Sequence, residues 1–264
     1  MRIALISDIH ANLPALTAVL ADIESREISS VFHLGDLVGY APWPNETVTA
    51  LRDAGIAGVC GNYDSTVASG YKHCGCKYED PHQEELSHVS YQWTRAKVSA
   101  ETKTFLGQLP FRLDLAPRGG HLSGQRIVLV HGTPTLNTLY WTEDRSDDFC
   151  LGMARYAELK TGDVIAFGHT HLPWHRRISG IHFVNTGSVG RPKDGDWRAG
   201  YAVLDLGEAE TSVEFVRVEY DAQLAAQAIR ASSLPSEFAE YLLTGGSFLS
   251  AAAEKSGSVG QPAR

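Results

Sequence analysis

Seven side chains of the kinds that bind metal ions in proteins follow five short apolar segments of this chain. They are Asp8, His10, Asp36, Asn62, His131, His169 and His171. In an open α/β sheet, ligands bind beyond the carboxyl ends of the strands, so five such segments can bring these side chains to one pocket. Each D-x-H or H-x-H pair is expected to place both side chains on one face, because side chains alternate along a strand. Glycines at 35, 61, 132 and 168 adjoin these ligands and permit sharp turns and close approach of a substrate.

The mixture of oxygen and imidazole ligands favours first-row transition metals. Carboxylate or amide oxygens and imidazole nitrogens together suit Mn, Fe, Co, Ni or Zn better than Ca or Mg. Seven ligands are too many for one such ion, but they suffice for two ions if a carboxylate bridges them. Two metal ions about 3.5–4 Å apart are suited to in-line displacement at phosphorus. A single Asp or His at a strand end is usually an ordinary loop residue, so the hypothesis depends on the whole set.

The first sixty residues alternate between predicted strands and helices. Apolar periodicity predicts strands at 3–6, 30–34 and 56–60, and helices at 13–27 and 44–54. Asn12 can cap the first helix, and Pro14 fits its first turn. A strand–helix–strand order of this kind predicts a parallel sheet with crossover helices, which would bring the strand ends to one edge.

The rest of the chain is expected to complete a single domain over 1–243. Residues 65–110 are interpreted as a helical insertion, or cap, over one end of the sheet, with helices at 84–96 and 100–109. Further strands are predicted at 126–130, 163–167, 174–178, 181–184, 201–206 and 211–220, and helices at 148–159, 221–230 and 236–243. The last four strands are expected to be antiparallel, because their connections are too short for crossover helices. Residues 244–264 are rich in Gly, Ser and Ala, which predicts a flexible tail.

Composition excludes several classes of protein. The 264 residues are 43% hydrophobic and 20% charged, with a net charge of −8, which disfavours binding to long nucleic acids. No apolar run approaches the roughly 20 residues that cross a bilayer, so no membrane association is expected. The N-terminus lacks the pattern of a signal peptide, and a cytoplasmic location is expected. Four irregularly spaced cysteines are too few for a disulfide framework.

Five blocks of the sequence resemble the signature blocks of the calcineurin-like metallophosphoesterases. They read SDIH at 7–10, GD at 35–36, GNYD at 61–64, HG at 131–132 and GHTH at 168–171. Longer stretches are similar to a small bacterial branch of predicted phosphodiesterases, among them LGDLVGYAPWPNE at 34–46 and VNTGSVGRPKDGD at 184–196. The resemblance extends to about residue 243. It implies an α/β fold, a four-layer α/β/β/α sandwich of two mixed sheets flanked by helices.

The same resemblance implies a dinuclear metal centre. One ion would be held by Asp8, His10, Asp36 and His171, and the other by Asp36, Asn62, His131 and His169. Two divalent ions per chain are expected, Mn foremost, with Fe, Ni, Co or Zn as alternatives. A hydroxide activated by these ions would attack phosphorus in line. The residues expected to serve catalysis are Asn62, Tyr63, Asp64 and His131.

Tyr63 departs from the family pattern, in which a histidine usually follows the asparagine of the third block. That histidine is generally assigned to contacting the phosphate or protonating the leaving oxygen, with the acid at position 64 orienting it. A phenol is protonated at neutral pH and can donate a hydrogen bond, but it carries no charge. Tyr63 is therefore interpreted as a substrate contact at the mouth of the site, as a stacking platform or as a packing residue.

Several other residues could contact the substrate, each with an ordinary structural alternative. Asn12 could bind a phosphate oxygen or cap a helix. Arg191 and Lys193 could bind a distal phosphate or lie in a solvated turn. Four aromatic residues could line a nucleobase pocket or pack in the core, namely Tyr40, Trp43, Tyr140 and Trp141.

The pair Cys74 and Cys76 raises the question of an additional metal site. Three histidines are near them in the sequence, namely His73, His82 and His88. A C-x-C pair supplies only two thiolates, and the usual spacing of a structural zinc site is absent. These residues are therefore assigned to the helical insertion.

The function favoured by these observations is that of a metal-dependent phosphohydrolase, a phosphodiesterase acting on a small nucleotide-like phosphoester. A phosphomonoesterase and a dinucleoside polyphosphate hydrolase are the alternatives within the same class of enzyme. A catalytically silent binding scaffold is disfavoured, because all seven ligand positions hold competent ligands. The sequence leaves the oligomeric state open, including a homo-oligomer.

Overall fold

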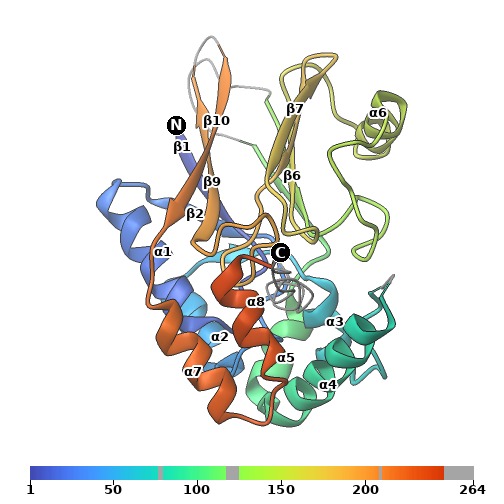
Figure 1. Cartoon of the computed structure of the whole chain (residues 1–264). Coiled ribbons are helices and arrows are strands. Elements are labelled where there is room, and N and C mark those ends of the chain that lie inside the picture. The colour runs from blue at the N-terminus through green and yellow to red at the C-terminus, as the bar shows by residue number, and fades with distance from the viewer. Residues whose placement is uncertain (77–79, 117–124, 208–209, 247–264) are drawn as a thin grey trace, which may run out of the picture.

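Two five-stranded sheets packed against each other form the centre of the protein in the computed structural model (Figure 1), which describes residues 1–76, 80–116, 125–207 and 210–246. The first sheet has the order β10-β9-β1-β2-β3, with β1 (Arg2–Ile6), β2 (Ser30–His33), β3 (Ala57–Gly58), β9 (Ala199–Leu206) and β10 (Thr211–Val218). The second has the order β4-β5-β6-β8-β7, with β4 (Arg112–Leu115), β5 (Ile127–Val130), β6 (Val164–Phe167), β7 (Trp174–Ile178) and β8 (Ile181–Asn185).

Each sheet contains three neighbouring parallel strands. These are β1, β2 and β3 in the first sheet and β5, β6 and β8 in the second. The predicted parallel arrangement of the first three strands is confirmed. The expectation that the last four strands are all antiparallel is wrong for β8, which is parallel to β6. The reason is that β7 reverses at the sheet edge in a hairpin with β8, so that β8 returns beside β6. The strands β9 and β10 are antiparallel and join the first sheet through β1.

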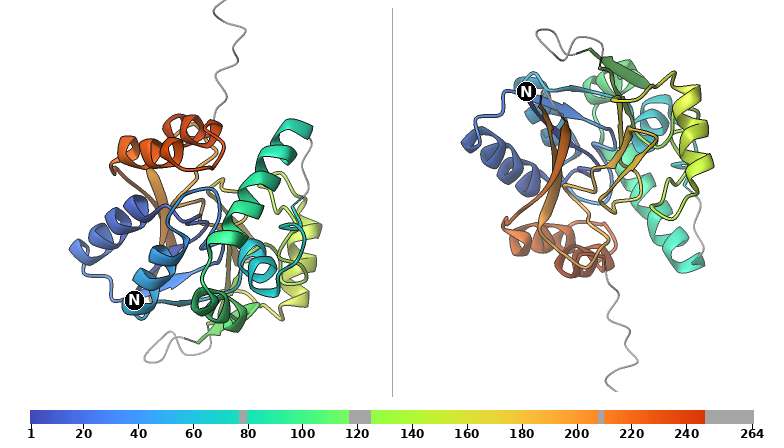
Figure 2. Two further views of the ribbon diagram at one scale, coloured as in Figure 1. Left: turned by 90° about the horizontal axis from the view of Figure 1, so that it is seen from below. Right: turned by 90° about the horizontal axis from the view of Figure 1, so that it is seen from above.

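Helices cover the outer faces of both sheets, which gives the four layers that the resemblance implied (Figure 2). The first sheet is covered by α1 (Leu13–Ser25), α2 (Pro44–Asp53), α7 (Ala222–Ala231) and α8 (Glu237–Thr244), and the second by α6 (Asp147–Tyr156). Alternation along β1 shows how one strand serves two layers. Leu5 packs between the sheets, whereas Ala4 and Ile6 pack against the helices. Among the helices described, none is long and apolar enough to cross a membrane.

Three helices follow β3 and lie at the end of the sheets to which the parallel strands point (Figure 1). They are α3 (Asn62–Ser69), α4 (Pro81–Lys97) and α5 (Ala100–Gln108). The sequence predicted α4 and α5 but not α3, whose polar segment NYDSTVAS has no apolar periodicity. It also missed the four-residue strand β4. Of the tail predicted to be flexible, residues 247–264 lie outside the described part, and Gly245 ends α8 in a left-handed conformation.

Candidate metal centre

The turns that follow β1 and β2 lie side by side and position the first ligands. The backbone N–H of Asp8 donates to the carbonyl of Gly35 (3.0 Å), and that of His10 donates to the carbonyl of Asp36 (3.0 Å). Two further turns pack against the side chains of Asp36 and Asp8, and each needs a glycine at the point of contact. A Cβ added at Gly61 would lie 2.1 Å from Oδ1 of Asp36, and one at Gly168 would lie 2.4 Å from Oδ2 of Asp8. The close packing of backbone against ligand therefore excludes any side chain at these two positions.

Five of the predicted ligands adopt a left-handed backbone. The φ angles are between 50° and 67° for Asp8, His10, Asp36, His169 and His171. The strands have already ended, β1 at Ile6 and β6 at Phe167. The expectation that strand alternation aligns the D-x-H and H-x-H pairs is therefore wrong, because turns place these side chains. A left-handed conformation costs a non-glycine residue roughly 1–2 kcal/mol, and such strain is typical of functional sites.

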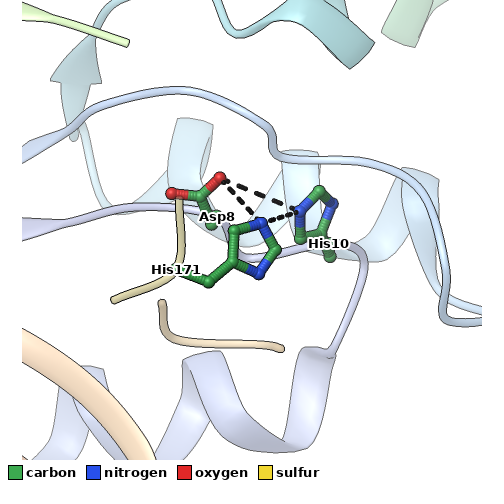
Figure 3. A group of neighbouring side chains, drawn as sticks. All are labelled: Asp8, His10 and His171. Atoms are coloured by element: carbon green, nitrogen blue, oxygen red, sulfur yellow. Dashed lines mark hydrogen bonds and ion pairs between the residues drawn. The ribbon is translucent and has the colours of Figure 1, made fainter. Parts of the chain in front are cut away.

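The first ligand group consists of Asp8, His10 and His171, whose ligand atoms lie within 4.8 Å of one another (Figure 3). Nε2 of His171 is 3.3 Å from Oδ1 of Asp8 and 3.1 Å from Nε2 of His10. The Nδ1 atoms of the two rings contact the backbone carbonyls of Val38 (3.1 Å) and Arg191 (2.5 Å). A carbonyl can only accept, so Nδ1 of each neutral ring carries the proton and Nε2 presents its lone pair to the site.

The second ligand group consists of Asp36, His131 and His169. Oδ2 of Asp36 is 3.5 Å from Nε2 of His131. A backbone carbonyl 2.8 Å from Nδ1 of His131 again leaves Nε2 toward the ligands. The same Oδ2 of Asp36 is 3.9 Å from Nε2 of His10, which belongs to the first group. One carboxylate oxygen therefore faces both groups.

Asn62, the seventh predicted ligand, lies beside the second group. Its Oδ1 is 3.0 Å from Nε2 of His131. Its Nδ2 donates to the backbone carbonyl of Cys74 (3.0 Å) and to Sγ of Cys76 (3.2 Å). These two acceptors fix the orientation of the amide, so that its oxygen faces the metal ligands. No signal in the sequence pointed to this contact with the 74–76 turn.

The chemistry of the two groups fits divalent cations. Oδ1 of Asp8 and Nε2 of His169 are buried and make no hydrogen bond within the described residues. Buried polar atoms without a partner are unfavourable, and a cation in each group would satisfy these two. All seven predicted ligand side chains are at most 4% exposed. The two groups can therefore hold two metal ions in an environment from which bulk water is excluded.

Burial and charge shift the pKa values of the metal-free site in different directions. Burial favours neutral forms, but the nearby histidines, His171 foremost, outweigh this and hold the pKa of Asp8 far below its usual range. Burial alone would lower the pKa of His131, yet Asp36 and Asp8 raise it to about 10. Burial lowers the pKa of the other three, namely His10, His169 and His171. These three rings are therefore neutral at neutral pH, the form that binds metal.

Asp64 contacts the backbone and has no hydrogen bond to the tyrosine beside it in the sequence. Its Oδ1 accepts from the N–H of Leu37 (2.9 Å), and its Oδ2 accepts from the N–H of Gly61 (3.0 Å). Burial and the charge of Asp36 raise the pKa of Asp64 to about 7. The expected role in orienting the residue at position 63 is not supported by these contacts. The carboxylate instead ties the turn of Asp36 to the start of α3.

Tyr63 is enclosed in the site and does not lie at its mouth. Its side chain is 1% exposed, and the ring centre is 5.1 Å from that of Tyr40 and 5.7 Å from that of Tyr91. The expected position at the mouth is therefore wrong, because these rings cover it. Its predicted proximity to the ligands is correct, since the ring lies 5.7 Å from that of His10 and lines the cavity above the two groups.

Arg191 and Lys193 line the same cavity. The guanidinium of Arg191 lies 4.0 Å from the ring centre of Tyr40, and 5.6 Å and 5.2 Å from those of Phe238 and Tyr241 on α8. Arg191 is 9% exposed and forms no ion pair with any residue that the structure describes. A buried cation without a carboxylate partner beside the ligand groups favours an anionic substrate.

Asn12 has a structural role instead of the expected phosphate contact. Its Oδ1 accepts from the N–H of Ala15 and caps α1. Its Nδ2 donates to the carbonyl of Gly190 (3.0 Å) and to the hydroxyl of Tyr220 (3.2 Å). The amide is fully buried, and both of its ends are occupied by these contacts. The helix-cap alternative is therefore the correct one.

The four candidate aromatic residues divide into two pairs. Tyr40 and Tyr140 line the cavity, and the ring centre of Tyr140 is 4.4 Å from that of His169. Trp141 is buried in the core between the second sheet and α6, and its ring stacks on that of Phe167 with 4.3 Å between the ring centres. Trp43 precedes α2 and packs against the helix layer of the first sheet. Only the two tyrosines are thus placed to contact a substrate.

A two-sheet sandwich that gathers two carboxylate–histidine groups at the carboxyl ends of its strands is the architecture of a metallophosphoesterase. The model of the calcineurin-like phosphoesterase superfamily domain matches residues 1–209. The chain belongs to this superfamily and is a hydrolase acting on phosphoester bonds.

Several known proteins are similar to this chain over most of its length. An uncharacterized protein of Methanocaldococcus jannaschii, MJ0912, is 33% identical over 260 residues, covering 92% of this chain and 98% of its own. Phosphodiesterase YfcE of Escherichia coli is 25% identical over 205 residues, covering 78% of this chain and 88% of its own. The crystal structure of a metallophosphoesterase from Sphaerobacter thermophilus has a TM-score of 0.70 and 29% identity, and the match covers 93% of this chain and all of that one.

Proposed function

We propose that the protein is a dinuclear metal-dependent phosphodiesterase acting on a small nucleotide-like phosphoester. The observation that carries this proposal is the position of Asp36, whose Oδ2 lies 3.5 Å from His131 of one ligand group and 3.9 Å from His10 of the other. One carboxylate can therefore bridge two ions, with Asn62 completing the second site. Mn is the ion that we place first, with Fe, Ni, Co or Zn as alternatives.

Two such ions, when bound, would supply an activated water nucleophile and neutralise charge on the phosphoryl group. The residues of the chain hold and orient the substrate around them. Arg191 places a guanidinium above the ligand groups, where it can donate to phosphate oxygens. The rings of Tyr40 and Tyr140 offer apolar faces to a base or an aryl group. The buried loops exclude bulk water and so strengthen these electrostatic contacts.

Tyr63 favours substrates with good leaving groups. The usual histidine of this position could protonate a departing alkoxide, whereas a phenol, with an ordinary pKa of about 10, is a much weaker acid. Aryl diesters, strained cyclic diesters and phosphoanhydrides need little such help. The name of the relative YfcE, a phosphodiesterase, supports the choice of a diester. A phosphomonoesterase remains the alternative with one ester bond to phosphorus.

A dinucleoside polyphosphate hydrolase is the second candidate, and Arg191 is the observation that favours it. A buried guanidinium next to the two ligand groups can bind a phosphate adjacent to the one that reacts. A simple diester offers no such second anion. Comparison of the two substrate types therefore discriminates between these functions.

The test is a panel of phosphoesters assayed separately with Mn, Ni, Co, Zn and Mg. The panel holds an activated aryl diester, the matching monoester, a cyclic nucleotide and a dinucleoside tetraphosphate. We expect metal-dependent hydrolysis, with the diester preferred to the monoester. His171→Gln and His131→Gln should abolish it, whereas His175→Gln, on the β7–β8 hairpin, should not. Failure of folded, metal-loaded protein to hydrolyse any of them would contradict an enzymatic role and favour a binding scaffold.

A further inference from the structure

A second cavity, of about 200 Å³, lies between the 73–76 turn and α4, and it shares Cys76 with the cavity of the metal centre. Its lining includes His73 and four further candidate ligands, namely the thiols of Cys74 and Cys76, the imidazole of His88 and the carboxylate of Glu84. We propose that this cavity, the thiol cavity, is a site for a third divalent cation of the zinc type, held by these four side chains. Neither the phosphoesterase activity nor the two ligand groups described above account for this cluster.

Two local structures bring the four side chains into one cavity. Glu84 and His88 are four residues apart on α4, so they project from the same face of the helix. Cys74 and Cys76 flank Gly75, whose φ of 78° permits the tight turn between them. The N–H of Cys76 donates to Sγ of Cys74 (3.4 Å), which keeps the first sulfur over the turn. Each structure thus supplies two ligands.

The chemistry of the four ligands favours zinc over the ions suited to the other site. Thiolates are soft ligands, and two of them with an imidazole and a carboxylate complete a tetrahedral zinc site. The Asp, Asn and His groups contain no sulfur, so the two kinds of site are chemically distinct. His73 lies outside the proposed ligand set, because its Nδ1 accepts from the N–H of Gly75 (3.2 Å) within the turn.

Binding requires a local rearrangement of exposed side chains. Among the described residues, only the two metal groups have ligand atoms gathered within 4.8 Å of one another. Glu84 and His88 are exposed, so they can turn into the cavity without disturbing the core. Each thiol releases its proton to solvent when it binds the ion, and no oxidant or reductant is involved. The ion would fasten the 73–76 turn to α4.

A cation in the thiol cavity would also influence the dinuclear centre indirectly, through the 73–76 turn. Cys76 lines both cavities, and its sulfur accepts a hydrogen bond from Asn62 (3.2 Å). The carbonyl of Cys74 accepts another from the same amide (3.0 Å). An ion that fixes this turn therefore fixes the acceptors that orient Asn62 toward His131.

Cobalt substitution tests the proposal, because thiolate-to-cobalt charge transfer absorbs in the near ultraviolet and carboxylate or imidazole ligands give no such band. The full chain is stripped with a chelator and titrated with Co²⁺, and absorbance and bound metal per chain are recorded. We expect a thiolate band and three ions per chain. The double variant Cys74→Ser/Cys76→Ser should lose the band and one ion. His88→Gln should lower the affinity of the thiol cavity for Co²⁺, measured from the growth of the band, at least tenfold.

Matched variants separate this site from the dinuclear centre. His82→Gln, on the same helix but outside the cavity, and Cys150→Ser, on the buried face of α6, should leave the band unchanged. His171→Gln should remove an ion from the first ligand group without removing the band. The absence of a thiolate band in the wild-type protein would overturn the proposal. The proposal would also be overturned if the band appeared with wild-type affinity for Co²⁺ in both His88→Gln and Glu84→Gln, since Cys76 would then be a ligand of the dinuclear centre. Both variants change exposed residues, so the test does not depend on folding of the cysteine variants.

Discussion

Asp36→Asn is the sharpest test of the dinuclear centre, because the two oxygens of this carboxylate have different partners. Oδ1 accepts from the N–H of Tyr63 (2.9 Å), and Oδ2 faces His131 and His10 of the two ligand groups. An amide offers a single acceptor oxygen. If that oxygen stays with Tyr63, the NH₂ group faces the ions. If the amide is reversed, the buried N–H of Tyr63 meets NH₂ and loses its acceptor, which costs about 1–3 kcal/mol.

Either arrangement removes the shared charged ligand. Loss of a partner outside the ligand set already lowers metal affinity about 10–100-fold, so loss of a direct bridging ligand should lower it at least about 100-fold, or about 2.7 kcal/mol. We expect at most one ion in the two ligand groups of each chain and a kcat/KM reduced at least about 100-fold on every substrate. The assay combines elemental analysis of reconstituted protein with steady-state kinetics.

Asp163→Asn is the matched control for this substitution. Asp163 is also buried and also accepts hydrogen bonds from the backbone, from the N–H groups of Arg126 (2.8 Å) and Lys160 (2.9 Å), but it is not part of either ligand group. We expect it to lower the free energy of unfolding by a similar amount in urea, with metal content and activity retained. Two ions retained in the two ligand groups, with wild-type kcat/KM, in Asp36→Asn would refute the bridging role of this carboxylate.

Three further predictions concern protons, leaving groups and charge. Because Asp36 and Asp8 raise the pKa of His131 to about 10, this ring is protonated in the metal-free protein at neutral pH, and metal binding must displace its proton. Metal affinity should therefore rise about tenfold per pH unit between pH 7 and 9 and fall toward acid. Calorimetry in buffers of different ionisation enthalpy should detect the release of about one proton. An affinity that does not change with pH would contradict this prediction. Tyr63→His should raise kcat/KM for alkyl esters relative to aryl esters by part of the ~10²–10⁴-fold that general acid catalysis supplies, and an identical leaving-group dependence would show that position 63 does not face the leaving group. Arg191→Gln should raise KM about 10–100-fold for a substrate with a second phosphate and leave a simple aryl diester nearly unchanged, as expected for one charge-assisted hydrogen bond; equal effects on both substrates would assign Arg191 to the reacting phosphate or to folding.

Local features of the sequence were enough to predict which candidate ligands come together and the framework that carries them. Seven Asp, Asn and His residues follow apolar segments of strand-like composition, and the structure brings six of them into two groups with the seventh beside one of them. The strand–helix–strand order of the first sixty residues predicted the parallel core of the first sheet. These inferences succeed because strand ends, glycine neighbours and ligand chemistry are properties of short segments.

The tertiary structure alone decided how the ligands are oriented and which other residues serve them. The left-handed turns of Asp8 and His10 are held by the turn that follows β2, and Asn12 caps its helix while donating to Gly190, 178 residues away. The orientation of Asn62 by the 74–76 turn and the enclosure of Tyr63 likewise depend on other elements packed against them. A one-dimensional pattern specifies which residues can bind an ion. The hydrogen bonds and packing that fix their atoms join segments far apart in the chain, and so they exist only once the two sheets and their helices have come together.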